Sequence, residues 1–349
     1  MIVSNKVTGL FSRLIPAKLR NVVLENICRA FPEAFGFEVT NICCANCSFC
    51  GYRFQQRKKG IMEETVFRKA IDDYCGIGGG SINLTPTVGE PLLDSNLADK
   101  IRYARSKKNI TDIWFYTNLI PLSKSNVNDL LTSGLTILKI STYIGDAESF
   151  KQIYKVDSYQ KVLSNIILLC ESNERLNKPV NIQLSMRVPK PFSKVRENKD
   201  FISIMRYFKE EEIHFFDELY DSWSGRIKDI DLPPGNKIYE NRFDNMKEPC
   251  YELFRRINIL YDGNVNVCAC RDLNIDLKIG NIMEDNIIDI WRGPKIANLR
   301  NDWLLGNVPD ICLECQRYLP VSAYYKKQQR NIANRYLGSK FQSKRRQKF

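Results

Sequence analysis

The chain is organised around residues 41–50, which read NICCANCSFC. Within them lies the spacing C-x3-C-x2-C, with thiols at Cys43, Cys47 and Cys50. Four thiolates would close a tetrahedral zinc site or fully ligate a 4Fe-4S cluster, whereas three leave one iron of such a cluster free for an outside ligand. Phe49 stands where an aromatic ring could cover a cluster. A zinc knuckle, or surface cysteines without a role, are the simpler alternatives, because short cysteine motifs recur by chance.

At these residues the chain resembles the radical S-adenosylmethionine (SAM) enzymes. Their signature, C-x3-C-x-aromatic-C, follows the first strand of a partial (β/α)6 barrel. The resemblance implies that Cys43, Cys47 and Cys50 hold a 4Fe-4S cluster whose free iron is chelated by SAM. It also implies that an electron from the cluster splits SAM, and that the resulting 5′-deoxyadenosyl radical takes a hydrogen atom from a substrate. Cys44 lies off the motif spacing, and we interpret it as a bystander.

Length and composition fit one barrel of about 200 residues plus a smaller module. No run of 18 apolar residues and no signal-peptide pattern occurs, so we expect a cytoplasmic protein. Twelve cysteines without a secretion signal indicate metal or redox chemistry and not disulfides. The single histidine, His214, argues against histidine-based zinc hydrolysis and against a Ser-His triad.

Charge is concentrated near the end of the chain. The net charge is +12, and the segment from Tyr318 onward carries nine Lys or Arg and no Asp or Glu. We therefore expect no nucleic-acid groove across the body of the protein. The basic tail, residues 319–349, is interpreted as a solvated segment, with contact to anionic lipid or an acidic substrate as the alternative.

Residues 1–34 are predicted to form an N-terminal helical extension, because their apolar residues recur near helical spacing. The helix would either cap the barrel or rest on an anionic membrane surface. Peptide-modifying relatives often carry an added peptide-binding domain of roughly 80 residues before the barrel, and 34 residues leave no room for one.

Residues 35–225 are predicted to be the barrel, an α/β fold. Strand and helix patterns alternate six times, which predicts a parallel sheet with crossover helices and an active face at the carboxyl ends of the strands. The expected strands are 35–40, 81–86, 112–117, 135–142, 180–187 and 212–216. The expected helices are 64–74, 94–104, 125–133, 146–173 and 200–208.

Gly89, Glu90 and Pro91 follow the second expected strand. A glycine lets backbone approach a ligand closely, and a carboxylate accepts a hydrogen bond from an ammonium group. The triplet resembles the Gly-Glu-Pro motif that binds the SAM amino group in radical SAM enzymes.

Other candidate cofactor-binding residues end later strands. Thr117-Asn118 resembles the Thr-Asn-Gly that ends the third strand in many relatives, although Leu119 replaces the glycine. By the same resemblance Ser141 lies near the SAM ribose and Arg187 pairs with the SAM carboxylate or ribose. A turn serine and a structural salt bridge are the alternatives. Phe49 completes this cofactor-binding set.

An acidic and aromatic stretch leaves the last expected strand, with Asp217, Glu218, Asp221 and Trp223. It would line a polar substrate pocket or form a solvated exit loop. Asp217 and Asp221 are the candidate catalytic residues, as acceptors of a substrate hydroxyl proton. Residues 226–249 contain Pro-Pro-Gly and are predicted to be a linker.

A second cysteine group comprises Cys250, Cys268, Cys312 and Cys315. The turn Tyr261-Asp262-Gly263-Asn264 predicts a hairpin between segments 257–261 and 265–268. Four thiolates make a closed site for one metal centre, and ligand count alone is equally compatible with structural zinc.

The spacing C-x12-G-x4-C, followed by Gly280-Asn281-Ile282 and a Trp291-containing helix, resembles the SPASM/twitch extension of radical SAM enzymes. No cysteine follows Cys315, so residues 250–318 are similar to the shorter twitch form, a small α+β domain with one auxiliary 4Fe-4S cluster, of the 2-deoxy-scyllo-inosamine dehydrogenase type. The role of Cys270 is left open. Cys28, Cys75 and Cys170 are interpreted as buried helix cysteines.

Together these resemblances imply a radical SAM oxidoreductase. The expected reaction is oxidation of an alcohol on a polyhydroxylated, sugar- or cyclitol-like small molecule, with the auxiliary cluster accepting an electron from the substrate radical. A flavodoxin or ferredoxin would supply the reducing electron. The alternatives are maturation of a ribosomally made peptide, redox-neutral sugar epimerisation, and a zinc-binding scaffold that docks nucleic acid through the basic tail.

Overall fold

The computed structural model describes residues 32–188, 193–216, 219–239, 246, 248–268 and 271–324. Nearly all of the expected N-terminal extension and most of the basic tail lie outside these ranges, as do Cys28, Asp217, Glu218 and Cys270. No helix in the described ranges is long and apolar enough to cross a membrane. All ten cysteines that the structure describes are free thiols.

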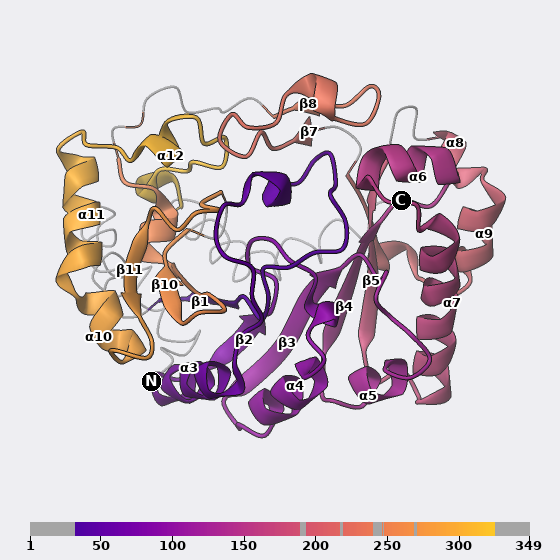
Figure 1. The fold of residues 1–349 in the computed structure, drawn as a ribbon, viewed down its shortest axis with the longest axis horizontal. Helices are drawn as coiled ribbons and strands as arrows, with labels where there is room; N and C mark the ends of the chain where they lie inside the picture. The colour runs from indigo at the N-terminus through magenta and orange to yellow at the C-terminus, as the bar shows by residue number, and fades with distance from the viewer. Residues whose placement is uncertain are drawn as a thin grey trace, which may run out of the picture.

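Nine strands form one open sheet in the order β11-β10-β9-β1-β2-β3-β4-β5-β6 (Figure 1). The six barrel strands pair in parallel from β1 to β6, as the alternation of strand and helix predicts. Their bounds are β1 Ala34–Phe37, β2 Gly80–Asn83, β3 Ile110–Thr117, β4 Ile137–Thr142, β5 Asn181–Arg187 and β6 Ile213–Phe216.

Burial along the strands explains why they form. In β3 the side chains of Ile113, Phe115 and Thr117 are buried at every second position, and the intervening ones are more exposed. This two-residue period is that of a strand with one face in the core. The strand bounds agree with the sequence prediction to within a few residues, and β1, β2 and β4 are each two residues shorter than expected.

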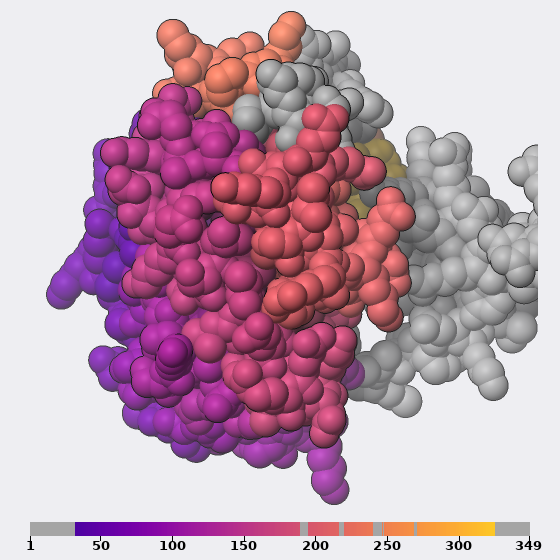
Figure 2. Space-filling view, turned by 90° about the vertical axis from the view of Figure 1, so that its right-hand side faces the viewer, coloured from indigo at the N-terminus to yellow at the C-terminus, as the bar shows by residue number. Residues whose placement is uncertain are grey.

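The crossover helices follow the outside of the curved sheet (Figure 1). They are α3 Glu64–Gly76, α4 Leu97–Arg105, α5 Val127–Leu131, α6 Ala147–Tyr154, α7 Tyr159–Arg175, α8 Ser193–Arg196 and α9 Lys199–Met205. Short 3₁₀ helices lie at η1 Gly51–Phe54, η2 Pro91–Leu93 and η3 Glu210–Glu212. In α7 the side chains of Val162, Ile166, Leu169 and Asn173 are buried at the spacing of one helix face. Figure 2 shows the side of the molecule that lies at the right in Figure 1, and residues from the middle of the chain cover it.

Two cysteines outside the motifs differ in burial. Cys170 is buried in α7, as predicted. Cys75 lies in α3 but is only half-buried, because the buried face of that helix is taken by Phe67, Ile71 and Tyr74.

The C-terminal region extends the barrel sheet instead of forming a separate one. Strand β9 (Arg256–Ile259) pairs in parallel with β1, and β10 (Asn264–Asn266) and β11 (Lys278–Asn281) add antiparallel. The predicted hairpin is therefore confirmed, although it was expected in a domain of its own. The remaining elements there are η5 Tyr251–Phe254, α10 Ile287–Arg292, α11 Pro294–Leu304 and α12 Asp310–Leu313.

Part of the stretch expected to be a linker is ordered. Strand β7 (Leu219–Tyr220) pairs in parallel with β8 (Lys237–Ile238), and η4 (Asp229–Asp231) lies between them. A small apolar group, Tyr220, Ile227 and Leu232, is buried beneath this segment. In Figure 1 it lies on the same side of the sheet as the cysteine loop that follows β1.

Candidate active site and auxiliary cysteine site

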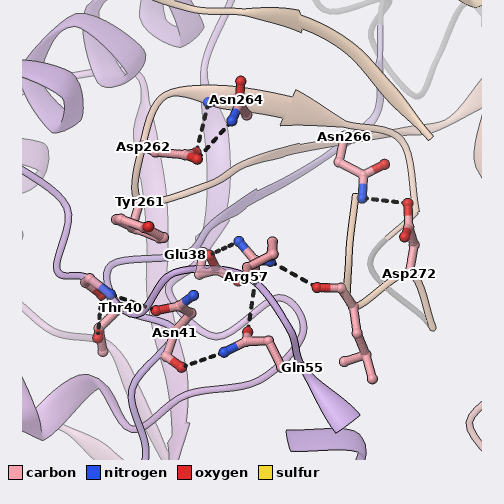
Figure 3. Close-up of polar contacts among 12 residues, drawn as sticks. Glu38, Thr40, Asn41, Gln55, Arg57, Tyr261, Asp262, Asn264, Asn266 and Asp272 are labelled. Atoms are coloured by element: carbon pink, nitrogen blue, oxygen red, sulfur yellow. Dashed lines mark hydrogen bonds and ion pairs between the residues drawn. The ribbon is translucent and has the colours of Figure 1, made fainter. Parts of the chain in front are cut away.

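The cysteine loop runs from the end of β1 to Gly60 and is held by backbone contacts on both sides. The N–H groups of Asn46 and Ser48 donate to the carbonyls of Tyr154 and Ile153 at 3.2 and 2.8 Å, at the end of α6. At the other end, the Asn41 side chain accepts from Gly60 N–H at 2.8 Å (Figure 3). It also donates to the Lys58 carbonyl at 2.9 Å. These protein contacts alone hold the loop in place.

The three motif cysteines are half-buried. Burial raises the pKa of both Cys47 and Cys50, and the nearby Arg187 guanidinium opposes the rise at each. A hydrogen bond with the Cys44 thiol raises the pKa of Cys43 and lowers that of Cys44. Such thiols become thiolates readily only when a positive centre replaces their protons. The donor set therefore fits a metal cluster, and Cys44 is adjacent to it although sequence spacing left it out.

Glu90 is almost completely enclosed, with 1% of its surface exposed. Its carboxylate accepts from the Thr117 hydroxyl and the Asn118 N–H, both at 2.7 Å, and from the Leu92 N–H at 3.1 Å. Burial raises its pKa to about 8, against the opposing effect of these donors. Glu90 thus joins the ends of β2 and β3, and Pro91 begins η2 directly after it.

Gly89 has a positive φ of +116°, and a Cβ there would lie 2.2 Å from the Thr40 carbonyl oxygen. The backbone of Glu90 also donates to the Ile42 carbonyl at 2.7 Å. The close approach that we predicted for a ligand is in this structure an approach to the cysteine loop itself. The Gly-Glu-Pro segment and the loop therefore pack as one unit.

Asn118 connects the end of β3 to the loop. Its side-chain nitrogen lies 3.6 Å from Cys43 Sγ and 3.5 Å from Cys44 Sγ. The next residue, Leu119, has a φ of +64°, a conformation that favours glycine. Leucine here thus adopts the backbone shape expected for the glycine it replaces, and the Asn165 side chain holds its carbonyl at 2.9 Å.

Phe49 lies among aromatic and cationic groups. Its ring is 5.6 Å from Tyr154 and 5.8 Å from Tyr220, centroid to centroid. The Arg187 guanidinium lies 5.0 Å from the Phe49 centroid and 5.6 Å from that of Tyr220. Ser141, at the end of β4, is half-buried and near the Tyr154 hydroxyl. The predicted cofactor-binding residues therefore converge on one end of the sheet.

The four cysteines predicted for the auxiliary site line one small cavity. They come from segments that are far apart in sequence, namely Cys250, Cys268, Cys312 and Cys315. Leu253, Leu277, Trp303 and Tyr318 supply apolar walls. Burial, with smaller effects of Cys315 and Asp272, raises the pKa of the Cys312 thiol to about 12. This enclosed four-thiol site fits a fully ligated cluster. Nowhere in the described ranges do three His, Cys, Asp or Glu side chains converge closely enough to hold a single metal ion.

Asp221 is buried between the two cysteine sites. It forms ion pairs with Arg271 and with Arg317, the latter at 3.1 Å, and accepts from the Trp223 N–H at 2.7 Å. The Trp223 indole donates to the Phe49 carbonyl at 2.9 Å. Both carboxylate oxygens of this predicted catalytic residue are thus engaged in structural contacts. The other predicted acid, Asp217, lies outside the described residues.

Sequence reasoning missed a buried ion pair beneath the cysteine loop. Arg57 donates to both carboxylate oxygens of Glu38, at 2.8 and 2.6 Å, and its Nε donates to the Leu273 carbonyl at 2.8 Å (Figure 3). An acid within the apolar strand pattern of residues 35–40 was the available signal, because a buried charge needs a partner. The sequence around Arg271 and Arg317 contains no comparable signal that these residues pair with Asp221.

A hollow of about 670 Å³ lies between residues 222–238 and the loop after α12. Ser222, Lys228, Glu314 and Gln316 supply its polar groups, and Cys315 is at its border. It therefore adjoins the auxiliary site.

Family models match two parts of the chain. The radical SAM superfamily model matches residues 37–182, and the SPASM iron–sulfur cluster-binding domain model matches residues 250–316. Among curated proteins, the GTP 3′,8-cyclase of Lactiplantibacillus plantarum is 23% identical over 180 residues, which is 50% of this chain and 50% of that protein. The chain thus aligns with about half the length of that relative.

Solved structures show the same fold at low sequence identity. BtrN in complex with AdoMet and 2-DOIA has a TM-score of 0.53 and 17% identity, over 84% of this chain and 96% of that one. Streptococcus suis SuiB bound to precursor peptide SuiA has a TM-score of 0.57 and 15% identity, over 81% and 70%. The anSMEcpe enzyme with AdoMet and the Cp18Cys peptide has a TM-score of 0.51 and 15% identity, over 89% and 98%.

Proposed function

Since the chain carries a radical SAM domain and a SPASM domain, and is therefore a radical SAM enzyme, we propose that it dehydrogenates an alcohol of a sugar- or cyclitol-like small molecule. The observation that carries this proposal is the cavity lined by all four auxiliary cysteines. A cluster with four thiolate ligands has no open iron for substrate, so it is suited to accepting an electron. The likeness to BtrN, which was crystallised with 2-DOIA, agrees with a small substrate.

When bound, the two clusters and SAM supply an adenosyl radical that removes a hydrogen atom and an acceptor for the electron left on the substrate. The balance is that of a two-electron oxidation. The carbinol carbon would lose one hydrogen atom to the 5′-deoxyadenosyl radical, giving deoxyadenosine, and one electron to a cluster held by the auxiliary cysteines, and the hydroxyl would lose a proton to a base. The product is a ketone.

The protein's own residues hold the reactants. Cys43, Cys47 and Cys50 would ligate the first cluster, and Asn118 would orient the Cys43 side of the loop through its 3.6 Å contact. Glu90 would accept from the SAM ammonium, since one of its carboxylate oxygens has a single described donor. Arg187 would pair with the SAM carboxylate or ribose, and Phe49 would cover the cluster and exclude water.

A base must take the hydroxyl proton. Asp221 is engaged by two guanidinium groups and a backbone N–H, so in this proposal it holds the loop in place. Asp217 remains the predicted proton acceptor. A flavodoxin or ferredoxin remains the predicted electron donor.

The test is anaerobic reconstitution of the full chain followed by incubation with dithionite, SAM and a panel of aminocyclitols and sugars deuterated at the carbinol carbon. We expect about eight irons per chain, as two 4Fe-4S clusters require. Deuterium should appear in deoxyadenosine, and the amount of deuterated deoxyadenosine should equal the amount of carbonyl product trapped by hydroxylamine. Deuterium transfer without a carbonyl would instead indicate epimerisation and contradict the proposal.

A peptide substrate is the second candidate. The hollow between residues 222–238 and 313–316 favours it, because a volume of about 670 Å³ bordering Cys315 has room for several side chains. Both SuiB and anSMEcpe were crystallised with peptides. A specific mass change on a precursor peptide, with no turnover of any small alcohol, would replace the first candidate by this one.

A further inference from the structure

Residues 271–274, here named the clasp, contact the cysteine loop that runs from the end of β1 to Gly60, here also called the SAM-cluster loop. The Leu273 carbonyl accepts from Arg57 Nε at 2.8 Å, and the Asn274 side chain accepts from the Gln56 N–H at 2.9 Å. The Leu273 side chain also packs closely against Gly51 of the loop, because a Cβ added at Gly51 would lie only 2.9 Å from it. The clasp therefore contacts the loop at both its backbone and its side chains.

The clasp is itself anchored at the auxiliary site. Asp272 is buried and accepts from the Asn266 side chain at 2.9 Å and from the Leu277 N–H at 2.8 Å (Figure 3). Asn266 lies two residues before Cys268. Movement of the Cys268 segment would therefore move the clasp through the Asn266–Asp272 hydrogen bond.

On the loop side, Arg57 has a geometry that few residues could reproduce. Its side chain is 9% exposed, and that of its partner Glu38, just after β1, is fully buried. The planar guanidinium donates to both oxygens of Glu38 with one edge and to Leu273 with Nε. A lysine has no fixed fork and cannot reproduce both contacts at once.

A second connection runs through Trp223. Its φ is +53°, and Ser224 follows at +54°, conformations that cost free energy for residues other than glycine. Arg271 of the clasp stacks 4.4 Å from the indole centroid and pairs with Asp221, which also binds Arg317. Arg317 lies two residues after Cys315. Both auxiliary cysteine segments thus hold a strained tryptophan against the Phe49 carbonyl.

We propose that the clasp makes the auxiliary site a positioning element for the SAM site, so that filling the four-cysteine cavity orders the loop that binds the first cluster and SAM. Arg57 is the positioning residue that transmits this effect. The inference rests on the cofactors of the two domains and holds whichever substrate is used, so failure of alcohol oxidation would leave it standing.

The experiment measures the dissociation constant of SAM for reconstituted full-length protein by calorimetry, with iron counts and the electron paramagnetic resonance signal of the reduced SAM cluster. Four proteins form a cycle: wild type, Cys312→Ala/Cys315→Ala, Arg57→Lys, and their combination. We expect the double-alanine protein to keep about four irons and to bind SAM about tenfold more weakly, within the usual range of coupling between sites. Arg57→Lys should weaken SAM binding by about as much with both clusters kept. The combination should be no weaker than the weaker of its parents, because both changes break one connection.

The control is Asp94→Asn/Lys100→Gln, which neutralises another buried ion pair of the barrel. Its effect on SAM affinity should add independently to that of the double-alanine change. If Arg57→Lys fails to fold, Asn274→Ala removes only the acceptor for Gln56 and should weaken SAM binding about threefold, as one lost hydrogen bond does. Wild-type SAM affinity and an unchanged resonance signal in the double-alanine protein would overturn the proposal, as would additive effects in the cycle.

Discussion

The cysteine loop after β1 and the auxiliary site both bring several thiols together, but they do so in opposite ways. The loop draws Cys43, Cys47 and Cys50 from eight consecutive residues. The auxiliary cavity draws its four cysteines from separate segments: Cys250 directly precedes η5, Cys268 follows the β9–β10 hairpin, Cys312 lies in α12 and Cys315 follows α12. A loop with three thiols leaves a coordination position for a small molecule, whereas four thiols close the site. In the proposed function, this difference would let the cysteine loop exchange a small ligand while the auxiliary site keeps a fully ligated cluster.

Their surroundings differ in the same sense. Arg271, Arg187 and Arg53 lie close enough to Cys50 to lower its pKa against the dominant effect of burial. Leu253, Leu277 and Trp303 wall the auxiliary cavity. Cationic and amide groups suit a charged ligand such as SAM, and the apolar walls would exclude water from a cluster bound in the auxiliary cavity.

The largest effect should come from removing one thiol on each side. Cys47→Ala should lower SAM cleavage by about 100-fold or more, since the radical chemistry resides in that cofactor. Cys312→Ala should keep slow SAM cleavage while net substrate oxidation is lost. Deoxyadenosine and oxidised product are quantified in the same reaction. Equal losses of both activities in the two variants would remove the distinction between the sites.

A pair of glycine substitutions compares the rigidity of the two regions. Gly89 and Gly263 both have positive φ, but a Cβ on Gly89 meets the Thr40 carbonyl at 2.2 Å, whereas one on Gly263 meets the movable Asn281 side chain at 2.9 Å. Gly89→Ala should lower the free energy of unfolding by about 5 kcal/mol, through strain plus overpacking. Gly263→Ala should cost about 1–2 kcal/mol from strain. Denaturant titration of both proteins decides, and equal costs would contradict the tighter packing of the SAM site.

Glu90 should make the stability of the protein depend on pH. Its pKa is raised by burial to about 8 in the folded protein, from 4.5. The proton is therefore held more tightly in the folded state, so its contribution to stability is complete below pH 4.5 and is lost as the pH rises through 8. The loss should be on the order of 4 kcal/mol and absent in Glu90→Gln. Unfolding midpoints of the wild-type protein and of the control variant Glu90→Gln, measured from pH 5 to 8.5, test this. If the two curves are parallel and differ only by a constant offset, Glu90 does not titrate in this range. Adding SAM should make the midpoint of the wild-type protein depend less steeply on pH if the SAM ammonium pairs with Glu90.

The comparison also explains what the sequence could predict. Cys43, Cys47 and Cys50 are recognisable because their geometry is local, and Gly89–Pro91 and Asn118 follow because parallel strands end at one edge. The four auxiliary cysteines were identified by motif spacing, but the pairing of β9 with β1 was not predicted. Strand pairing between distant segments depends on tertiary packing and leaves no periodic signal in either segment.

Arg57, Arg271 and Arg317 were not predicted for a related reason. Each is a charged residue in a loop, where charge is ordinarily solvated, and only the folded chain places it against Glu38 or Asp221. Asp221 was predicted as an acid near the active face, and in the structure it accepts from Trp223, whose indole donates to the Phe49 carbonyl. Its two arginine partners, drawn from the auxiliary segments, could not be inferred from residue type or spacing. Contacts between the two sites are thus the part of the structure that sequence patterns specify least.

The smallest expected effect comes from a substitution at the contacts between the two cysteine sites. Asp221→Asn keeps an oxygen to accept from the Trp223 N–H but removes the charge that pairs with Arg271 and Arg317. Because Arg317 is largely exposed and Arg271 keeps its stacking on Trp223, the free energy of unfolding should fall by only about 2 kcal/mol. If Asp221 joins the two sites, SAM cleavage and substrate oxidation should fall together, by less than about tenfold. If it is the catalytic base, oxidation should fall while SAM cleavage without product formation persists. We expect the first result, because both carboxylate oxygens are already engaged where a base would need one free to take a proton.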